Sequence, residues 1–237
     1  VILELGGSNP GIIFEDSDID DVIGRVFAGR FSNCGQNCDS LKRLIVHDTI
    51  YEDVLKKLKI EMQSKKIGDP ENKETYFGTL CSKKQFEVAN AQLNDALDKG
   101  AKIFSQKEIP ENLNGSFFTP IILTNVTNNM KIMTEEVFAP ILPVLKFSTK
   151  DDAVKIANDT NFGLGATIFT KNKKLFDEVS NDLMCGNVDH NNVYQWLPCN
   201  PFGGFKDSGI GRENGKQGLL ELTQIKVVSR EKLVKKK

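Results

Sequence analysis

The chain has 237 residues, which is long enough to bury a sizeable core in one or two domains. Hydrophobic residues make up 39% and charged residues 27%, as in ordinary globular proteins, and a formal net charge of −1 gives no global field that would attract nucleic acid or a membrane surface. No apolar run approaches the roughly 18–20 residues of a spanning helix, no signal peptide is visible, and the basic run 230–237 is interpreted as a solvated tail.

The cysteine count indicates a reducing compartment. Five cysteines, an odd number, favour free thiols over a disulfide framework, so we expect a cytoplasmic protein. Only two histidines occur, and Cys34 with Cys38 lacks a second pair of the kind that completes a zinc site. We therefore expect no metal.

The first half of the chain alternates between short apolar runs and amphipathic helices. In the first helix one apolar face recurs at helical spacing, from Ile19 through Val22, Ile23 and Val26 to Phe27. The elements predicted for this half are strands at 1–5, 12–14, 44–46 and near 103–104, and helices at 19 to about 33, 51–66 and 86–99.

The second half continues this alternation. The elements predicted here are an extended segment at 117–123, strands at 141–147, 166–169, from 186 onward and at 223–228, and helices at 153–158 and 173–183. Ser148 and Asp151 are expected to form a capping box for the helix at 153–158. Segment 191–215 is rich in Gly, Pro and Asn and is longer than a plain connector, which is typical of functional loops.

The order of strands and helices predicts the fold class. Alternation through most of the length favours an α/β fold with a parallel, doubly wound sheet. Gly6 and Gly7 follow a strand, but their spacing is not that of a dinucleotide-binding turn. We therefore expect the cofactor-binding domain to lie outside these residues.

Two residues suggest nucleophilic chemistry. Cys38 lies in a Gly-containing loop just beyond a helix, where a thiol served by a base could attack a carbonyl and a backbone N–H could stabilise the resulting oxyanion. Glu4 ends an apolar strand, where burial would raise its pKa towards that of a useful base. The alternatives are a packed, inert thiol at Cys38 and a surface carboxylate at Glu4.

Five segments carry a family resemblance. Glu4 to Pro10 and Asn33 to Cys38 resemble the glutamate and cysteine signatures of the NAD(P)-dependent aldehyde dehydrogenase superfamily, and their separation matches as well. Segments 135–140, 158–164 and 201–213 resemble further family stretches in the same order, although Ala139 replaces the commoner Gly. The resemblance covers the whole chain.

The resemblance implies roles for the catalytic residues. Cys38 would attack an aldehyde to give a thiohemiacetal, whose hydride passes to the nicotinamide of NAD or NADP. Glu4 would be the general base for the water that hydrolyses the resulting thioester, and Glu213 would assist proton transfer from Glu4. The backbone N–H of Cys38 would be one oxyanion donor. The alternative for Glu213 is a non-catalytic surface acid beside Arg212.

The resemblance also implies cofactor and substrate contacts. Glu136 would hydrogen-bond the nicotinamide ribose, with Phe138 near the ring and Gly6 on the cofactor side; the alternative for Glu136 is a solvated acid at a helix end. On the substrate side the resemblance implies Asn191, Phe202, Trp196 and Cys199. The sequence after Glu4 and Cys38 is most similar to succinate-semialdehyde dehydrogenase-like members, and Lys42 or Arg43 could then hold a substrate carboxylate.

Since family members are longer, the resemblance implies a C-terminal half that acts with an N-terminal cofactor domain or a partner chain, in a homo-oligomer. The expected divisions are the end of a cofactor-domain strand at 1–6, a catalytic domain at 7–206, a return to the cofactor domain at 207–222, and an oligomerisation strand with a basic tail at 223–237. Two alternatives stay open: a non-catalytic remnant or interaction subunit, and a cofactor-independent cysteine esterase.

Overall fold

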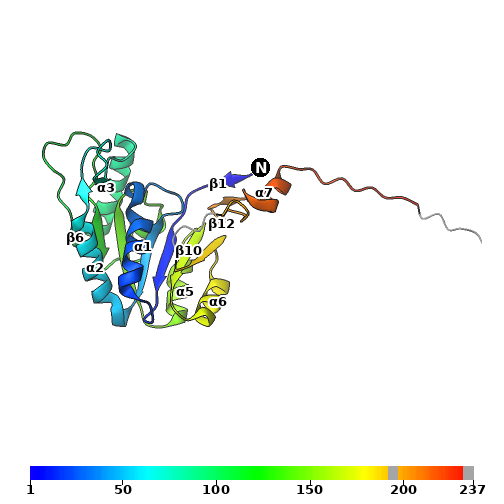
Figure 1. Ribbon diagram of the computed structural model, residues 1–237, viewed down its shortest axis with the longest axis horizontal. Coiled ribbons are helices and arrows are strands. Elements are labelled where there is room, and N and C mark those ends of the chain that lie inside the picture. The colour runs from blue at the N-terminus through cyan, green and yellow to red at the C-terminus, as the bar shows by residue number, and fades with distance from the viewer. Residues whose placement is uncertain (192–196, 232–237) are drawn as a thin grey trace, which may run out of the picture.

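In this computed structural model, which describes residues 1–191 and 197–231, a central seven-stranded sheet carries the fold (Figure 1). All neighbouring strands are parallel except the last pair, β7 and β6. From one edge to the other the strands are β11 (Asn187–His190), β10 (Gly165–Phe169), β2 (Asn9–Ile13), β3 (Leu41–His47), β8 (Ile141–Phe147), β7 (Ile121–Thr124) and β6 (Lys102–Gln106).

The central strands are buried on both faces, as expected for parallel strands covered by crossover helices. Successive side chains point to opposite faces, so Ile13 and Val46 join one hydrophobic cluster while Ile12 and Ile45 join a second. Two separate cores therefore lie on the two sides of the sheet.

Five longer helices supply the outer layers. They are α1 (Ile19–Phe31), α2 (Tyr51–Ser64), α3 (Lys83–Asp98), α5 (Lys150–Asn158) and α6 (Lys173–Asp182). Buried residues of α1, α2 and α3 belong to the first cluster, and those of α5 and α6 belong to the second. In Figure 1 the two groups lie on different sides of the strands.

Shorter elements connect or extend this body. The turns are η1 (Ser32–Gly35) and η2 (Asp48–Ile50), and the short helices are α4 (Lys131–Thr134) and α7 (Gly215–Glu221). Three small sheets have two strands each: β1 (Leu3–Glu4) with β13 (Gly209–Ile210), β9 (Phe162–Gly163) with β12 (Phe205–Lys206), and β4 (Lys66–Ile67) with β5 (Thr75–Phe77). Figure 1 shows β1 leading away from the main sheet towards α7.

The sequence located most of the main elements, but one helix cap differs. Thr149, rather than Ser148, caps α5, because its hydroxyl accepts a hydrogen bond from the Asp152 N–H at 3.2 Å. Ser148 instead donates to the Asp48 carboxylate at 2.7 Å. The cap and its partner are thus each one residue later than predicted.

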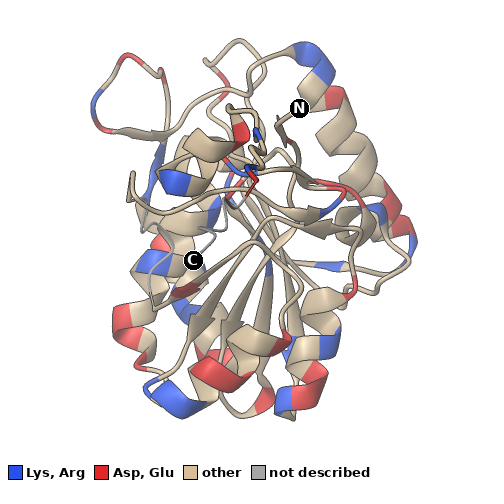
Figure 2. Ribbon diagram, turned by 90° about the vertical axis from the view of Figure 1, so that its right-hand side faces the viewer, with Lys and Arg blue, Asp and Glu red and all other residues tan. Residues whose placement is uncertain are grey.

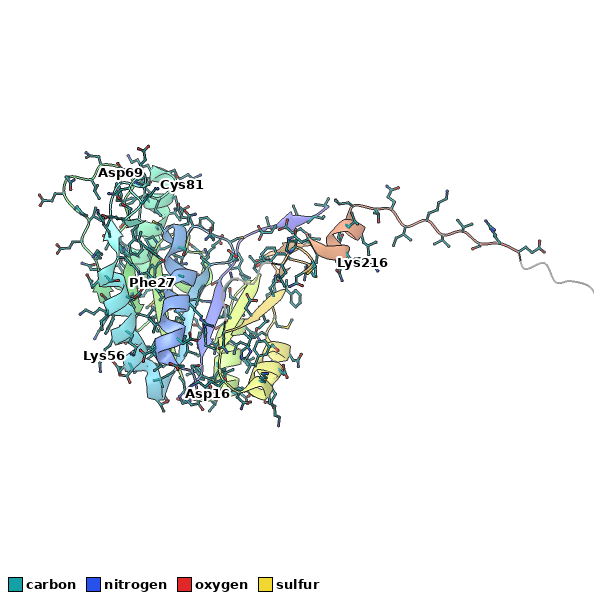
Figure 3. All side chains as sticks on the ribbon, in the orientation of Figure 1. Asp16, Phe27, Lys56, Asp69, Cys81 and Lys216 are labelled. Carbon is teal, nitrogen blue, oxygen red and sulfur yellow. The ribbon has the colours of Figure 1, made fainter. Side chains whose placement is uncertain are left out.

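The predicted strand at 223–228 is not formed in this structure. After α7 the described chain runs away from the body, and its side chains extend into solvent (Figure 3). Ile225 is 94% exposed and Val227 is 84% exposed. A strand needs a neighbour to pair its backbone groups, and no other described strand lies beside this segment.

Charge is distributed over the outside of the fold. Figure 2 shows acidic and basic residues of both signs along the helices, while the strands between them carry few charges. Among the described helices, none is both long and apolar enough to cross a membrane.

Candidate active site

The chain turns sharply before Cys38. Three consecutive residues, Asn33, Cys34 and Gly35, have φ values of 51°, 56° and 72°, in the left-handed region that non-glycine residues seldom adopt. A Cβ at Gly35 would lie 2.7 Å from the Ala139 carbonyl oxygen, so only glycine fits this close approach. Local strain of this kind is found at functional sites, and here it directs the chain into the loop that carries Cys38.

A buried asparagine fixes the backbone of the nucleophile candidate. The Asn9 amide donates to the Cys38 carbonyl at 3.0 Å and to the Ser40 carbonyl at 3.2 Å, and its Oδ1 accepts from the Gly165 N–H at 2.9 Å. A Cβ at Gly7 would lie 2.7 Å from the Cys38 carbonyl oxygen. The loop before β3 is therefore bound to the start of β2 and to β10.

Glu4 and Cys38 are brought together. The half-buried Cys38 thiol and the exposed Glu4 carboxyl act on each other's pKa, although one lies before β3 and the other in β1. Partial burial raises the pKa of Glu4; the bond to Cys38 opposes this, and the charges of Glu213, Glu136 and Asp39 add to the rise.

The same surroundings act on the thiol. Burial, followed by the negative charges of Glu4 and Asp39, raises the pKa of Cys38 to about 12. The thiol therefore keeps its proton at neutral pH unless a base takes it. The carboxylate of Glu4 is the base in contact with it.

Glu136 and Gly6, both expected on the cofactor side, lie next to each other. The backbone N–H of Gly7 donates to Glu136 Oε1 at 3.1 Å, and a Cβ at Gly6 would lie 2.5 Å from Glu136 Oε2. A side chain at Gly6 would displace this carboxylate, so the glycine keeps space for it. Phe138, two residues after Glu136, lies with its ring under the ammonium group of Lys42 at 4.4 Å.

Glu213 and Phe202 are joined through their backbones. Each donates its N–H to the other's carbonyl at 2.8 Å, which holds the turn after β13 against the segment that follows residue 200. The charge of Glu213 acts on Glu4, so the structure brings this acid to the site.

A cavity adjoins the loop that carries Cys38, although Cys38 itself does not line it. Its lining includes Phe202 together with Asp39, the residue after the nucleophile candidate, and Asp189 of β11. Burial, and secondly the charge of Asp39, raises the pKa of Asp189 to about 6. No periodic pattern in the sequence pointed to these two acids, because they come together only through strand pairing.

One residue expected on the substrate side, Asn191, is not brought to Cys38. Asn191 follows the carboxyl end of β11, while Cys38 precedes the amino end of β3 in the same parallel sheet. The Asn191 side chain accepts a hydrogen bond from the Thr170 N–H at 3.0 Å and donates one to the Thr170 carbonyl at 2.9 Å. Trp196 lies outside the described residues.

Lys42 and Arg43 do not face the cavity, so the suggestion that they hold a substrate carboxylate is wrong in this structure. They are 1% and 0% exposed. The Arg43 guanidinium donates to the carbonyls of Ser8, Ile156 and Ala157 at 2.7–2.9 Å. Arg43 therefore binds α5 to the loop before β2, and Lys42 turns to the opposite side of the strand.

Comparisons with known proteins agree with this geometry. The model of the aldehyde dehydrogenase family matches residues 1–228. An aldehyde dehydrogenase of Davidiella tassiana is 42% identical over 97% of this chain and 46% of its own length, and a mitochondrial succinate-semialdehyde dehydrogenase of Oryza sativa subsp. japonica is 39% identical over 96% and 43%.

Solved structures match equally well. The betaine aldehyde dehydrogenase of Staphylococcus aureus in complex with NAD+ superposes with a TM-score of 0.89 at 34% identity, covering 93% of this chain and 44% of that one. An aldehyde dehydrogenase of Bacillus cereus gives 0.91 at 38% identity, covering 95% and 46%.

The relatives and solved structures described above are all named aldehyde dehydrogenases. The chain belongs to the aldehyde dehydrogenase family. It spans about half the length of the curated relatives it matches.

Proposed function

We propose that this chain is the catalytic part of an NAD(P)-dependent aldehyde dehydrogenase that oxidises an aldehyde to a carboxylic acid through a covalent intermediate on Cys38. One observation carries the proposal. The segment that carries Glu4 packs against the Cys38 loop, since a Cβ at Gly7 would lie 2.7 Å from the Cys38 carbonyl oxygen, and the Cys38 thiol and the Glu4 carboxyl act on each other's pKa.

In the first step Glu4 takes the thiol proton as Cys38 Sγ forms a bond to the carbonyl carbon, giving a thiohemiacetal. The Cys38 N–H is the proposed donor to the oxyanion, and the bonds from Asn9 to the Cys38 and Ser40 carbonyls hold the loop in place for it. When bound, the nicotinamide accepts the hydride lost from that carbon, which leaves a thioester.

The second step is hydrolysis. Once Glu4 has released the thiol proton to solvent, it removes a proton from water. The resulting hydroxide adds to the thioester carbonyl, and the carbon–sulfur bond breaks to release the acid and the Cys38 thiolate, which is then reprotonated. A raised pKa suits this role, because a stronger base removes the water proton more readily. Glu213, whose charge also acts on Glu4, is the proposed route for the proton to leave.

The residues present fit a nicotinamide cofactor. Glu136 offers carboxylate oxygens beside a glycine that leaves room for them, and such oxygens accept hydrogen bonds from ribose hydroxyls. Phe138 supplies an aromatic ring two residues later, and Gly6 is the proposed close-approach position.

The remaining parts of the reaction are proposed to lie in a cofactor-binding domain, which corresponds to the half of the relatives that this chain does not cover. Exposed apolar side chains in the small sheet and α7 are the surface we propose it packs on. They are Leu3, Leu5, Ile210, Leu219, Leu220 and Leu222.

The proposed divisions are the end of a cofactor-domain strand at 1–6, the catalytic domain at 7–206, a return to the cofactor domain at 207–222, and an oligomerisation strand with a basic tail at 223–237. In this proposal the last segment joins a neighbouring subunit's sheet in a cytoplasmic homo-oligomer. Helices on both faces of the sheet support a doubly wound arrangement for the catalytic domain.

For the substrate we propose a small aldehyde, with succinate semialdehyde as the first candidate because of the rice relative. Two acids, Asp39 and Asp189, line the cavity next to the Cys38 loop, and their charges would oppose binding of the carboxylate of succinate semialdehyde. A neutral aldehyde of equal length is therefore the decisive comparison.

The test is NADH and NADPH formation by this chain, alone and together with the cofactor-binding half of a relative. Succinate semialdehyde, butyraldehyde and betaine aldehyde serve as substrates. The proposal predicts activity that requires both parts and is lost in Cys38→Ser. Absence of activity with both parts folded and assembled would leave a non-catalytic interaction subunit.

A second candidate function is cofactor-independent ester cleavage. The pair of Cys38 and Glu4 is complete within this chain, and a thiol with a base can cleave an activated ester without hydride transfer. Cleavage of 4-nitrophenyl acetate that persists without cofactor and fails in Cys38→Ala would support it.

A further inference from the structure

Lys42 of β3 has its ammonium group buried beneath the cysteine loop, residues 35–38. The Lys42 side chain is 1% exposed, and Nζ donates to the carbonyls of Asn37 at 2.6 Å and of Gly35 at 3.3 Å. These carbonyls lie before Cys38, so the ammonium fixes the loop from within.

The same ammonium contacts the cofactor-side segment, residues 136–138. Lys42 Nζ lies 3.6 Å from Glu136 Oε1, donates to the Val137 carbonyl at 3.3 Å, and lies over the Phe138 ring at 4.4 Å. Three successive residues of this segment therefore contact one cation.

Through Glu136 the contacts reach a third segment. Glu136 Oε1, the oxygen that faces Lys42, also accepts from the Gly7 N–H at 3.1 Å, three residues after Glu4. One buried charge thus connects the nucleophile loop, the carboxylate proposed for the ribose, and the strand end that carries the proposed base.

Packing alone does not account for this lysine. Burying an ammonium group is costly, and an apolar side chain of similar size would fill the same space. Arg30 of α1 already binds the stretch around Val137 to the start of β3, donating to the carbonyls of Val137 at 3.2 Å, Ala139 and Leu41. A second cation is therefore not needed to hold the backbone together.

We propose that Lys42 is a positioning residue, which orients Glu136 for the cofactor and couples cofactor binding to the placement of Cys38. This inference rests on the proposed function, since it assigns a partner to the cofactor carboxylate of the same site. Lys42 forms no hydrogen bond with the Cys38 thiol and does not line the cavity next to the Cys38 loop, so it acts through Glu136 and the loop.

The pH dependence follows from the surroundings of Lys42. Burial, and secondly the charge of Arg30, lowers the pKa of Lys42 to about 7, while Glu136 and Cys38 act in the other direction. The cation is present below that pH and is lost above it. Cofactor affinity is therefore expected to fall as the pH rises through about 7.

The experiment uses the enzyme formed by this chain with its cofactor-binding half. Lys42→Met is compared with Lys42→Arg, which keeps the charge, and with Lys146→Met as a matched control. Lys146 also lies over an aromatic ring, Tyr51 at 4.2 Å, and pairs with Glu52 at 3.4 Å, but it is 52% exposed and remote from the site.

Two readouts are independent of turnover: the Kd of NAD+ by calorimetry, and the rate at which iodoacetamide alkylates Cys38, with and without NAD+. Lys42→Met is expected to raise the Kd of NAD+ about tenfold. It should also abolish the pH dependence of that Kd near pH 7 and the effect of NAD+ on the alkylation of Cys38. Lys42→Arg should recover most of the affinity, and Lys146→Met should behave as the wild type.

A double-mutant cycle separates positioning from mere stability. In a Glu136→Gln background, Lys42→Met should add little to the loss of affinity, because its effect passes through that carboxylate. Full additivity, or a wild-type Kd and alkylation rate in Lys42→Met, would overturn the inference. If instead the wild-type enzyme binds NAD+ but oxidises no aldehyde, the proposed function fails while the positioning role is still decided by these readouts.

If Lys42→Met does not fold, Lys42→Arg and the pH dependence of the wild-type Kd decide the question. A Kd that does not change between pH 6 and pH 8, together with an unchanged alkylation rate in Lys42→Arg at pH 8, would contradict the inference.

Discussion

The two partners of the candidate active site lie in regions of very different construction. Cys38 is held by the main sheet, where Asn9, Arg30 and Lys42 are all buried and bound to the surrounding backbone. Glu4 lies in β1, a two-residue strand whose one strand partner is the equally short β13. Both of its neighbours, Leu3 and Leu5, are exposed.

This difference indicates that the loop of the proposed nucleophile is fixed within this chain, whereas the position of the proposed base depends on further packing. The apolar surface beside Glu4 is the surface proposed to meet a cofactor-binding domain. Docking of that domain is then expected to fix Glu4 and Glu213 while changing little around Cys38.

The largest effect is expected from Glu4→Gln. Loss of a general base lowers kcat by about 10²–10⁴-fold. Because Glu4 must be deprotonated and its pKa is raised, wild-type activity should fall as the pH drops through that raised value, and this acid limb should vanish in the variant. Stopped-flow NADH formation from pH 5 to 9 measures both, with the exposed Glu15→Gln as control.

A wild-type rate in Glu4→Gln, or an unchanged acid limb, would contradict the assignment of the base.

The sheet region is tested by Arg43→Met. Removing this guanidinium leaves three carbonyls, of Ser8, Ile156 and Ala157, without their donor. We expect the free energy of unfolding to fall by about 2–4 kcal/mol. Urea denaturation measures it, and Lys56→Met on the exposed face of α2 should change it by less than about 0.5 kcal/mol. Equal effects of the two variants would show that Arg43 does not hold the sheet.

Asp189 lies at the sheet edge and gives a pH-dependent effect. Its folded pKa is raised to about 6, above its ordinary value of 3.8, so charging it opposes folding. The folded protein is therefore more stable at low pH, where Asp189 is neutral, and it loses this stability as the pH rises through about 6. The full difference in pKa corresponds to about 3 kcal/mol, which we discount to about 1–2 kcal/mol because the group is partly exposed.

Asp189→Asn should therefore be more stable than the wild type at pH 8 by that amount, with a smaller difference at pH 5. Urea midpoints at the two pH values measure it, and a difference independent of pH would contradict this origin.

The smallest effect is expected in the C-terminal segment. Ile225→Ser and Val227→Ser remove side chains that are 94% and 84% exposed, so the unfolding free energy of this chain should change by less than about 0.5 kcal/mol. In the assembled enzyme the same changes should promote dissociation, as measured by sedimentation velocity. A large loss of stability in the isolated chain would show that the segment packs on the body.

The sequence predicted the main sheet because its strands and helices carry strong periodic patterns. The strand at 141–147 coincides with β8, and the helix at 51–66 with α2 to within two residues. It also singled out Glu4 and Cys38, since each lies in a dense local motif. Prediction was wrong for 223–228 in this structure, where alternation signals a strand but no described strand pairs with the segment.

The positioning residues were harder to predict because their roles depend on which way adjacent side chains point. Lys42 and Arg43 are neighbours on one strand, so they face opposite sides of the sheet. One reaches the cysteine loop and the other reaches α5. Asn9 likewise lies within a recognised motif, yet its link to the Cys38 carbonyl exists only once β2 and β3 pair.

The most direct test of the central claim is to find which of the five cysteines acts as the nucleophile. The chain is mixed with a limiting amount of 4-nitrophenyl acetate, quenched in acid, digested and mapped by mass spectrometry. We expect the acetyl group on Cys38, although this thiol is half-buried, and we expect no labelling of the Cys38→Ser protein. Acetylation of the exposed Cys81 and Cys199 with an unmodified Cys38 would contradict it.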